Sequence, residues 1–422
     1  MPANKVHAFL HRATVLRETR FRRFFMGYTT SLFGTSMASI AIIFAVLNSG
    51  GSASDLGYVM AAGIVPQILL LLSGGVFADR IGRRPIMLGA DIVRFGAQGT
   101  LAAALFVGKP SIWLFIAVSA LRGAGDSFFG PALTGLTVEM VKTDELANAN
   151  ALLGVARSGT SVAGPALAGL LVALAGAPTV IAIDAGSYAV SALALSTLQL
   201  GRPKPTGNSL IRDLIDGFDE FRSRNWVWIT SVQFSLFNLI TWGPVLVLGP
   251  VLANQYLSGA RAWGVVMAVY GLGAVLGGML ALGRRPRKPV AVAAMASLGY
   301  PLPCAALALH APVAVVTVAA LMAGIGSALF LTFWYTALQQ QVPADALARV
   351  DSFVTLGAYV FGPAAFALAG PVAAAVGAAS VLGTGAIWAV ASSLAVLALP
   401  AVRSVTWRPL PATDRKAADR VA

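Results

Sequence analysis

Apolar stretches of twenty or more residues follow one another along this chain, with only short polar breaks between most of them. A helix needs about 20 largely apolar residues to cross the hydrocarbon core of a bilayer. We therefore predict an all-α integral membrane fold with twelve transmembrane helices. The predicted spans are 24–48, 56–78, 85–107, 111–139, 148–175, 178–199, 226–252, 260–283, 289–309, 312–339, 346–375 and 378–400.

The composition supports a membrane setting. Hydrophobic residues make up 57% of the chain and charged residues only 11%, against roughly 25% charged residues in a soluble domain. A water-soluble fold has too little interior to cover this much apolar surface. We expect the lipid bilayer to surround most of the protein.

A polar segment, 200–225, divides the chain into two bundles of six helices, 24–199 and 226–400, with tails at 1–23 and 401–422. The halves resemble each other. "GGVFADRIGRRPIML" lies between spans two and three, and "GGMLALGRRPRKPVAV" lies between spans eight and nine. Such a half-length repeat is typical of secondary transporters, whose substrate site lies between the halves.

The positive charges indicate the topology. The formal net charge is +13, which suits either a nucleic-acid-binding protein or a membrane protein with basic cytoplasmic loops. Of the 30 lysines and arginines, 25 fall on the side of the two termini, whereas Lys109 and Arg261 fall on the other. Both termini are therefore predicted to be cytoplasmic, and no basic patch remains for nucleic acid.

The loop after span two has a recognisable pattern, G-x-x-x-D-R-x-G-R-R. It resembles the signature loop of the major facilitator superfamily, and the twelve spans and the half-repeat agree with that resemblance. The resemblance implies two pseudo-symmetric bundles that transport a substrate by alternating access. The residues that carry it are Gly75, Asp79, Arg80, Gly82, Arg83 and Arg84.

Asp79 is the acidic member of this basic turn and needs a positive partner, either Arg80, Arg83 or the N-terminus of a neighbouring helix. The resemblance implies that the acid meets the start of span eleven, which follows Pro343. We predict that Asp79 latches the two halves together on the cytoplasmic side and favours an outward-open state. The simpler interpretation is a basic turn that only sets the topology.

Ionisable residues inside the spans suggest proton coupling, because charge within a bilayer is costly. Arg122 and Asp126 are four residues apart in span four and share one helical face. The resemblance implies that an arginine in span four takes part in proton coupling. We predict that Asp126 binds a proton when Arg122 moves away, with Asp184 in span six as a second proton site. A static structural pair is the alternative.

Three other charged residues within the spans are predicted to form ion pairs with a structural role. Asp91 and Arg94, three residues apart in span three, are predicted to form a self-neutralising pair that reinforces the latch. Arg157 in span five has no acid near it on its own helix. We expect it to pair with Asp126 or Glu139.

Span five carries a partial match to the G-P-x-x-G-G ending found in antiporters of this superfamily, at Gly164, Pro165 and Gly169. Small residues here permit close helix packing. Span eight, with Gly273 and Gly277, is the predicted partner. The stretches 145–158 and 337–352 look like the branch that includes macrolide and siderophore exporters, so the resemblance favours export.

The substrate cavity is predicted from the resemblance, which places spans one, four, seven and ten around it. Span seven offers Gln233, Phe237 and Asn238, and span ten offers Phe333 and Trp334. Aromatic surface with a few amides suits a bulky, largely apolar ligand. Packing inside the bundle is the alternative role for each of these residues.

Together these features predict a proton-coupled exporter of a small amphiphilic compound, such as an antibiotic, drug or siderophore. We expect a monomer in the cell membrane of a bacterium. A proton-coupled uptake symporter and a membrane scaffold or sensor are the alternatives. The chain has no P-loop lysine motif and no pattern of residues typical of an enzyme, metal or cofactor site, and Cys304 is expected in the core.

Overall fold

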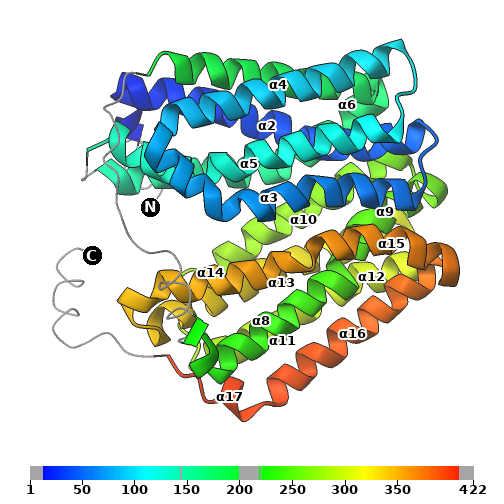
Figure 1. Cartoon of the computed structure of the whole chain (residues 1–422). Helices are drawn as coiled ribbons and strands as arrows, with labels where there is room; N and C mark the ends of the chain where they lie inside the picture. The colour runs from blue at the N-terminus through cyan, green and yellow to red at the C-terminus, as the bar shows by residue number, and fades with distance from the viewer. Residues whose placement is uncertain (1–12, 143–144, 199–217, 220, 408–422) are drawn as a thin grey trace, which may run out of the picture.

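The computed structural model describes residues 13–142, 145–198, 218–219 and 221–407, and every element in this part of the chain is helical (Figure 1). The side chains of 71–80 are outside the description. The predicted linker, 200–225, lies mostly outside it as well, so the domain boundary there stays a prediction. The first half contains η1 (Ala13–Arg17), α2 (Thr19–Asn48), α3 (Ala53–Ile81), α4 (Arg83–Val107), α5 (Ile112–Met140) and α6 (Leu146–Ser196).

The helices of the second half are interrupted more often. α8 (Asn225–Phe237), the π-helical turn η3 (Asn238–Trp242) and α9 (Gly243–Tyr256) follow one another without a gap, as do α11 (Pro289–Ala296), η4 (Ser297–Gly299) and, after Tyr300, α12 (Pro301–Ala308). The remaining helices are α10 (Gly259–Ala281), α13 (Val313–Gln341), α14 (Ala344–Val360), α15 (Gly362–Val376), α16 (Ala378–Ala398) and α17 (Pro400–Arg403).

The predicted number of spans is reached when α6 is counted as two. Eleven helical segments among the described residues are long and apolar enough to cross a membrane, and one of them is the 49-residue segment of α6. Gly176 divides α6, because its backbone has a φ of 81° and a ψ of 159°, far from helical values. Glycine adopts a positive φ without the steric cost that other residues meet. Spans five and six both belong to α6 and meet at the kink at Gly176.

The helices form two bundles that lie side by side, and both described ends of the chain lie at the same end of the molecule (Figure 1). We call this the terminal end, which also carries the α3–α4 turn and the loop before α11. The opposite, distal end carries the α2–α3, α4–α5 and α12–α13 turns. The polar breaks predicted from the sequence thus alternate between the two ends.

The bundles meet through small residues near the distal end. A Cβ atom added to Gly57 of α3 would lie 2.2 Å from the carbonyl oxygen of Phe366 in α15, and one added to Gly370 would lie 2.3 Å from the backbone nitrogen of Ser54. Helices α6 and α10 meet in the same way, because a Cβ atom on Gly169 would lie 3.0 Å from the Cα of Gly264. Backbone-to-backbone approach of this kind is possible only where side chains are absent.

Candidate functional site

A cavity of about 340 Å³ lies between the bundles. Its two walls differ in chemistry. The helices of the N-terminal bundle contribute apolar residues together with all of the polar lining residues, which are Ser39, Gln67, Ser119, Arg122 and Asp126. The C-terminal bundle contributes Leu246, Trp263, Met267 and Phe366, which are all apolar or aromatic. A pocket with a largely apolar surface and a few polar groups on one side suits an amphiphilic ligand.

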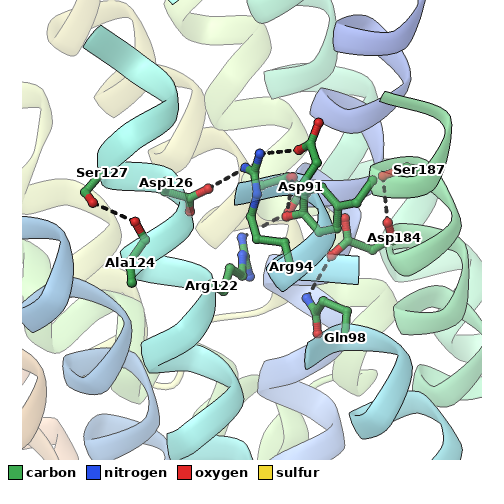
Figure 2. A network of polar contacts seen from close by, with 11 residues as sticks. Asp91, Arg94, Gln98, Arg122, Ala124, Asp126, Ser127, Asp184 and Ser187 are labelled. Atoms are coloured by element: carbon green, nitrogen blue, oxygen red, sulfur yellow. Dashed lines mark hydrogen bonds and ion pairs between the residues drawn. The ribbon is translucent and has the colours of Figure 1, made fainter. Parts of the chain in front are cut away.

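Behind the polar wall lies a buried network of charged side chains (Figure 2). Arg94 of α4 forms ion pairs with Asp91 on its own helix and with Asp126 of α5, the latter at 2.8 Å. Asp91 is fully buried and the Arg94 side chain is 4% exposed, whereas the Asp126 side chain is 31% exposed. The predicted Asp91–Arg94 pair is therefore present, but it extends to the cavity through Asp126.

Asp126 thus pairs with Arg94 and not with Arg122, which the spacing within α5 had suggested. The guanidinium of Arg122 instead lies 3.5 Å from the backbone carbonyl oxygen of Thr35 in α2. The Thr35 hydroxyl forms a hydrogen bond of 2.9 Å with the Tyr188 hydroxyl of α6. Helix spacing identifies neighbours on one helix, but the register between α4 and α5 decides which arginine reaches Asp126.

Asp184, the second predicted proton site, belongs to the same network. It is fully buried in α6 and accepts a hydrogen bond of 2.7 Å from the side-chain amide of Gln98 in α4. Its other carboxylate oxygen has no hydrogen-bond partner. A buried carboxylate oxygen without a partner is energetically unfavourable, so this group has the capacity to bind a proton.

The predicted latch is described only in part. Gly82, with a φ of 107°, makes the turn between α3 and α4. Arg83 forms an ion pair of 2.5 Å with Glu139 of α5, and Arg84 donates a hydrogen bond of 2.9 Å to the Leu195 carbonyl of α6. Gly75 lies within α3, and the side chains of Asp79 and Arg80 are outside the description, so the latch stays a prediction.

Arg157 does not form either of its expected ion pairs. Its Nε atom donates a hydrogen bond of 3.0 Å to the hydroxyl of Tyr28 in α2. Glu139 pairs with Arg83 and Asp126 pairs with Arg94. The prediction was wrong because it considered the acids of span four without the arginines of span three and the preceding turn.

The antiporter-type residues lie at close helix contacts. A Cβ atom on Gly164 would lie 2.1 Å from the hydroxyl oxygen of Ser36 in α2, within the same bundle, whereas Gly169 faces α10. The predicted contact between spans five and eight is therefore present, but through Gly264. Gly273 and Gly277 of α10 face α13, where added Cβ atoms would approach backbone atoms to 2.3 and 2.5 Å.

The five residues predicted to contact substrate do not line the 340 Å³ cavity. Phe237, Phe333 and Trp334 are buried, with exposures of 6%, 4% and 4%. Asn238, the first residue of η3, donates to the carbonyl oxygens of Phe234 in α8 and Ala358 in α14 at 3.1 and 3.3 Å. Gln233 is partly buried. In this arrangement of helices these side chains contribute to packing, and their contact with substrate stays a prediction.

Sequence reasoning missed the walls that α3, α10 and α15 contribute. Gln67 was the available signal on α3, because it is an amide in an otherwise apolar span. Trp263 and Met267 of α10 gave no such signal, because aromatic and sulfur-containing side chains also fill the packed interior of a helix bundle. Among the described residues, no group of three or more His, Cys, Asp or Glu side chains is arranged to hold a metal ion.

Comparison with known proteins identifies the family. Residues 24–365 match the profile of the Major Facilitator Superfamily. The chain belongs to this superfamily. It is thus a multi-pass membrane protein of a transporter family, as its sequence indicated.

Two characterised superfamily members are similar to this transporter over long stretches. The multidrug efflux pump Tap of Mycobacterium tuberculosis is 27% identical over 407 residues, which cover 90% of this chain and 94% of the pump. Macrolide efflux protein A of Streptococcus pyogenes is 23% identical over 266 residues. That match spans 62% of this chain and 65% of the length of the macrolide protein.

Solved structures of transporters share the fold. The crystal structure of a peptide transporter of the POT family with bound sulfate superposes with a TM-score of 0.73 at 13% identity, covering 92% of this chain and 96% of the other. A bacterial homologue of the iron transporter ferroportin, in an inward-facing state, superposes with a TM-score of 0.67 at 16% identity, covering 90% and 99%. At these identities the similarity shows the fold alone.

Proposed function

We propose that the chain is a proton-coupled exporter of small amphiphilic compounds, as predicted from the sequence. The observation that carries the proposal is the buried network of α4, α5 and α6, which reaches the cavity at Asp126. The network contains three carboxylates and two guanidinium groups. These are Asp91, Asp126, Asp184, Arg94 and Arg122.

The unequal number of charges supports proton coupling. With all five groups ionised, the network has one net negative charge inside the membrane-spanning region. Unpaired charge in a bilayer is expensive, so binding one proton makes the network neutral. A carboxylate that can reach the cavity therefore has two favourable states, one with a proton and one with a nearby positive charge.

The direction of transport is proposed from the relatives. Both characterised relatives have names that describe efflux, of macrolides and of multiple drugs. The antiporter-type residues Gly164, Pro165 and Gly169 lie at the tight α2–α6 and α6–α10 contacts. Export of an amphiphile in exchange for protons agrees with the apolar wall at Trp263 and Phe366 and the polar wall at Asp126.

The remaining features of the proposal follow from the topology. The charge bias supports a cytoplasmic position for the terminal end. In that orientation the distal contacts join the bundles on the outer side of the membrane. We infer that one chain suffices for transport, because the cavity lies between the two halves of a single chain. The energy source is the proton gradient, without an enzymatic reaction, metal or cofactor.

The test is drug accumulation in a pump-deficient bacterial host that expresses the full chain. Ethidium and a macrolide such as erythromycin are the probes, and a protonophore collapses the gradient. We expect lower accumulation in cells with the wild-type chain and restored accumulation after the protonophore. Higher accumulation would indicate uptake, and unchanged accumulation of both probes would count against export of this class of compound.

A matched pair of variants links the result to the network. Asp126→Asn should remove gradient-dependent efflux, whereas Asp219→Asn, at an exposed position of the terminal end, should retain it. Equal protein levels in the membrane are checked by immunoblot. Full proton-dependent efflux by the Asp126→Asn variant would contradict the proposed coupling.

A further inference from the structure

Arg94 of α4 contacts two carboxylates with different access to water. One terminal nitrogen bonds the fully buried Asp91, and the other lies 2.8 Å from Asp126. Only Asp126 lines the cavity. Water and protons from the cavity can therefore reach Asp126, whereas Asp91, on the other side of Arg94, is closed off from the cavity.

The packing holds the Arg94 guanidinium in place. Its central carbon lies over two aromatic rings, 4.7 Å from the centroid of Phe129 and 4.5 Å from that of Tyr188. A cation over an aromatic face is attracted by the ring quadrupole. The aliphatic stem of Arg94 passes α5 at Gly125, where an added Cβ atom would lie 2.9 Å from its Cγ. A larger residue at position 125 would displace the stem.

The other groups around Asp126 leave Arg94 as its direct ionic partner in this structure. Arg122 lies on the same helix, and Asp184 and Tyr188 of α6 form hydrogen bonds with Gln98 and Thr35, respectively. The cavity residues that face it from α2 and α3 are polar but uncharged at Ser39 and Gln67. Those from the C-terminal bundle are Leu246, Trp263, Met267 and Phe366, none of which is charged.

We propose that Arg94 is a positioning residue for proton coupling: its fixed guanidinium sets when Asp126 binds and releases a proton. The inference rests on the proposed proton-coupled transport. When α5 shifts relative to α4, Asp126 leaves Arg94, and one of its carboxylate oxygens takes a proton from cavity water. When the contact forms again, the proton returns to the cavity and Arg94 neutralises the carboxylate. Asp91 keeps Arg94 paired in both situations.

The experiment measures protonation directly and needs no substrate. The purified full chain is titrated with acid and base in detergent, and the infrared band of the protonated carboxyl group is followed. The band that Asp126→Asn removes is assigned to Asp126. We expect Arg94→Gln to move the midpoint of this band upward, because the favourable cation is lost.

Two further variants test the geometry while Arg94 is kept. Asp91→Asn should move the midpoint downward, because Arg94 then has one carboxylate partner instead of two and a negative neighbour is gone. Gly125→Ala changes no charge but displaces the Arg94 stem, so it should move the midpoint upward by less than Arg94→Gln. A purely structural role for Arg94 would not produce shifts of opposite sign.

Arg157→Gln is the matched control. It removes an arginine whose side chain bonds only the hydroxyl of Tyr28 in the described contacts, and it should not move the midpoint.

The outcomes separate this inference from the proposed function. Unchanged midpoints in Asp91→Asn and Gly125→Ala would overturn the role of Arg94, whether or not Arg94→Gln folds. The expected shifts together with wild-type efflux that ignores the proton gradient would overturn the proposed function while the Arg94–Asp126 coupling stands. Gradient-dependent efflux with unchanged midpoints would overturn only the role of Arg94.

Discussion

The contact of Gly57 with α15 predicts that a single methyl group will separate the two bundles at the distal end. In Gly57→Ala the new Cβ atom would lie 2.2 Å from the Phe366 carbonyl oxygen, about 1.2 Å closer than the 3.4 Å at which ordinary contact begins. Alanine is a better helix former than glycine, so α3 itself is not weakened. The strain is relieved when the bundles move apart.

Overpacking of this kind costs about 1–3 kcal/mol. Because Phe366 belongs to the other bundle, the cost applies to the state with distal contacts and not to a state in which those contacts are broken. The ratio of the two states should therefore change by about 5- to 150-fold toward distal opening. An effect at the upper end of this range is expected if the Phe366 carbonyl cannot tilt away.

The assay is a pulsed electron spin resonance distance measurement on the full chain in lipid, with Cys304 replaced by alanine. Spin labels at Lys109→Cys and His310→Cys report on the distal end, and labels at Lys142→Cys and Arg285→Cys report on the terminal end. Gly57→Ala should lengthen the first distance and shorten the second. Gly278→Ala is the control, because an added Cβ atom there has no neighbour within 4 Å. Identical distance distributions in wild type and Gly57→Ala would refute the reasoning.

Three further predictions follow from individual contacts. Asp184→Asn leaves the network with two arginines and two acids, so it no longer has a net charge that favours proton binding. Gradient-driven efflux of ethidium should fall while probe binding is retained, and undiminished coupling would exclude Asp184 from the proton pathway. Trp334→Phe removes the 2.9 Å hydrogen bond from the indole to Thr230 and should cost about 1 kcal/mol, seen as a lower thermal unfolding midpoint in detergent with efflux retained; lost efflux in folded protein would instead support the predicted substrate contact. Cys304 of α12 is fully buried, so it should react with a membrane-permeant maleimide only after denaturation. Rapid labelling of the native protein would contradict this burial.

The spans could be predicted from the sequence because the bilayer imposes one simple rule on length and polarity. The Asp91–Arg94 pair could be predicted too, because residues three apart share a helix face. The contact of Arg94 with Asp126 could not, since it depends on how α4 and α5 are aligned along their axes. One sequence contains no direct information on that register.

The substrate residues were harder for a different reason. Phe237 and Trp334 have the composition expected of a cavity wall, but the same rings fill the inside of a bundle. Asn238 bonds the backbone carbonyls of Phe234 and of Ala358 in α14, and its predicted contact with substrate stays a prediction. A buried amide in a span has these two roles open to it, and only the packing distinguishes them.

The two bundles differ in the polar contacts described inside them. The N-terminal bundle holds the ion pairs of Arg94 with Asp91 and Asp126. In the C-terminal bundle, the hydroxyl groups of Ser297 in η4 and Ser393 in α16 share a hydrogen bond of 2.8 Å. Both partners in this contact are uncharged. Hydroxyl groups do not change charge in the pH range of a cell, so this contact cannot respond to the proton gradient.

The proton response should therefore arise in the N-terminal bundle, with the C-terminal bundle following through the distal contacts. Replacing both Ser297 and Ser393 by alanine removes the two partners together, which is close to neutral for stability. We expect this double variant to keep the infrared midpoint of Asp126 and the gradient dependence of efflux. If its midpoint moved as far as that of Arg94→Gln, the protonation equilibrium would depend on both bundles, and an origin confined to α4, α5 and α6 would be wrong.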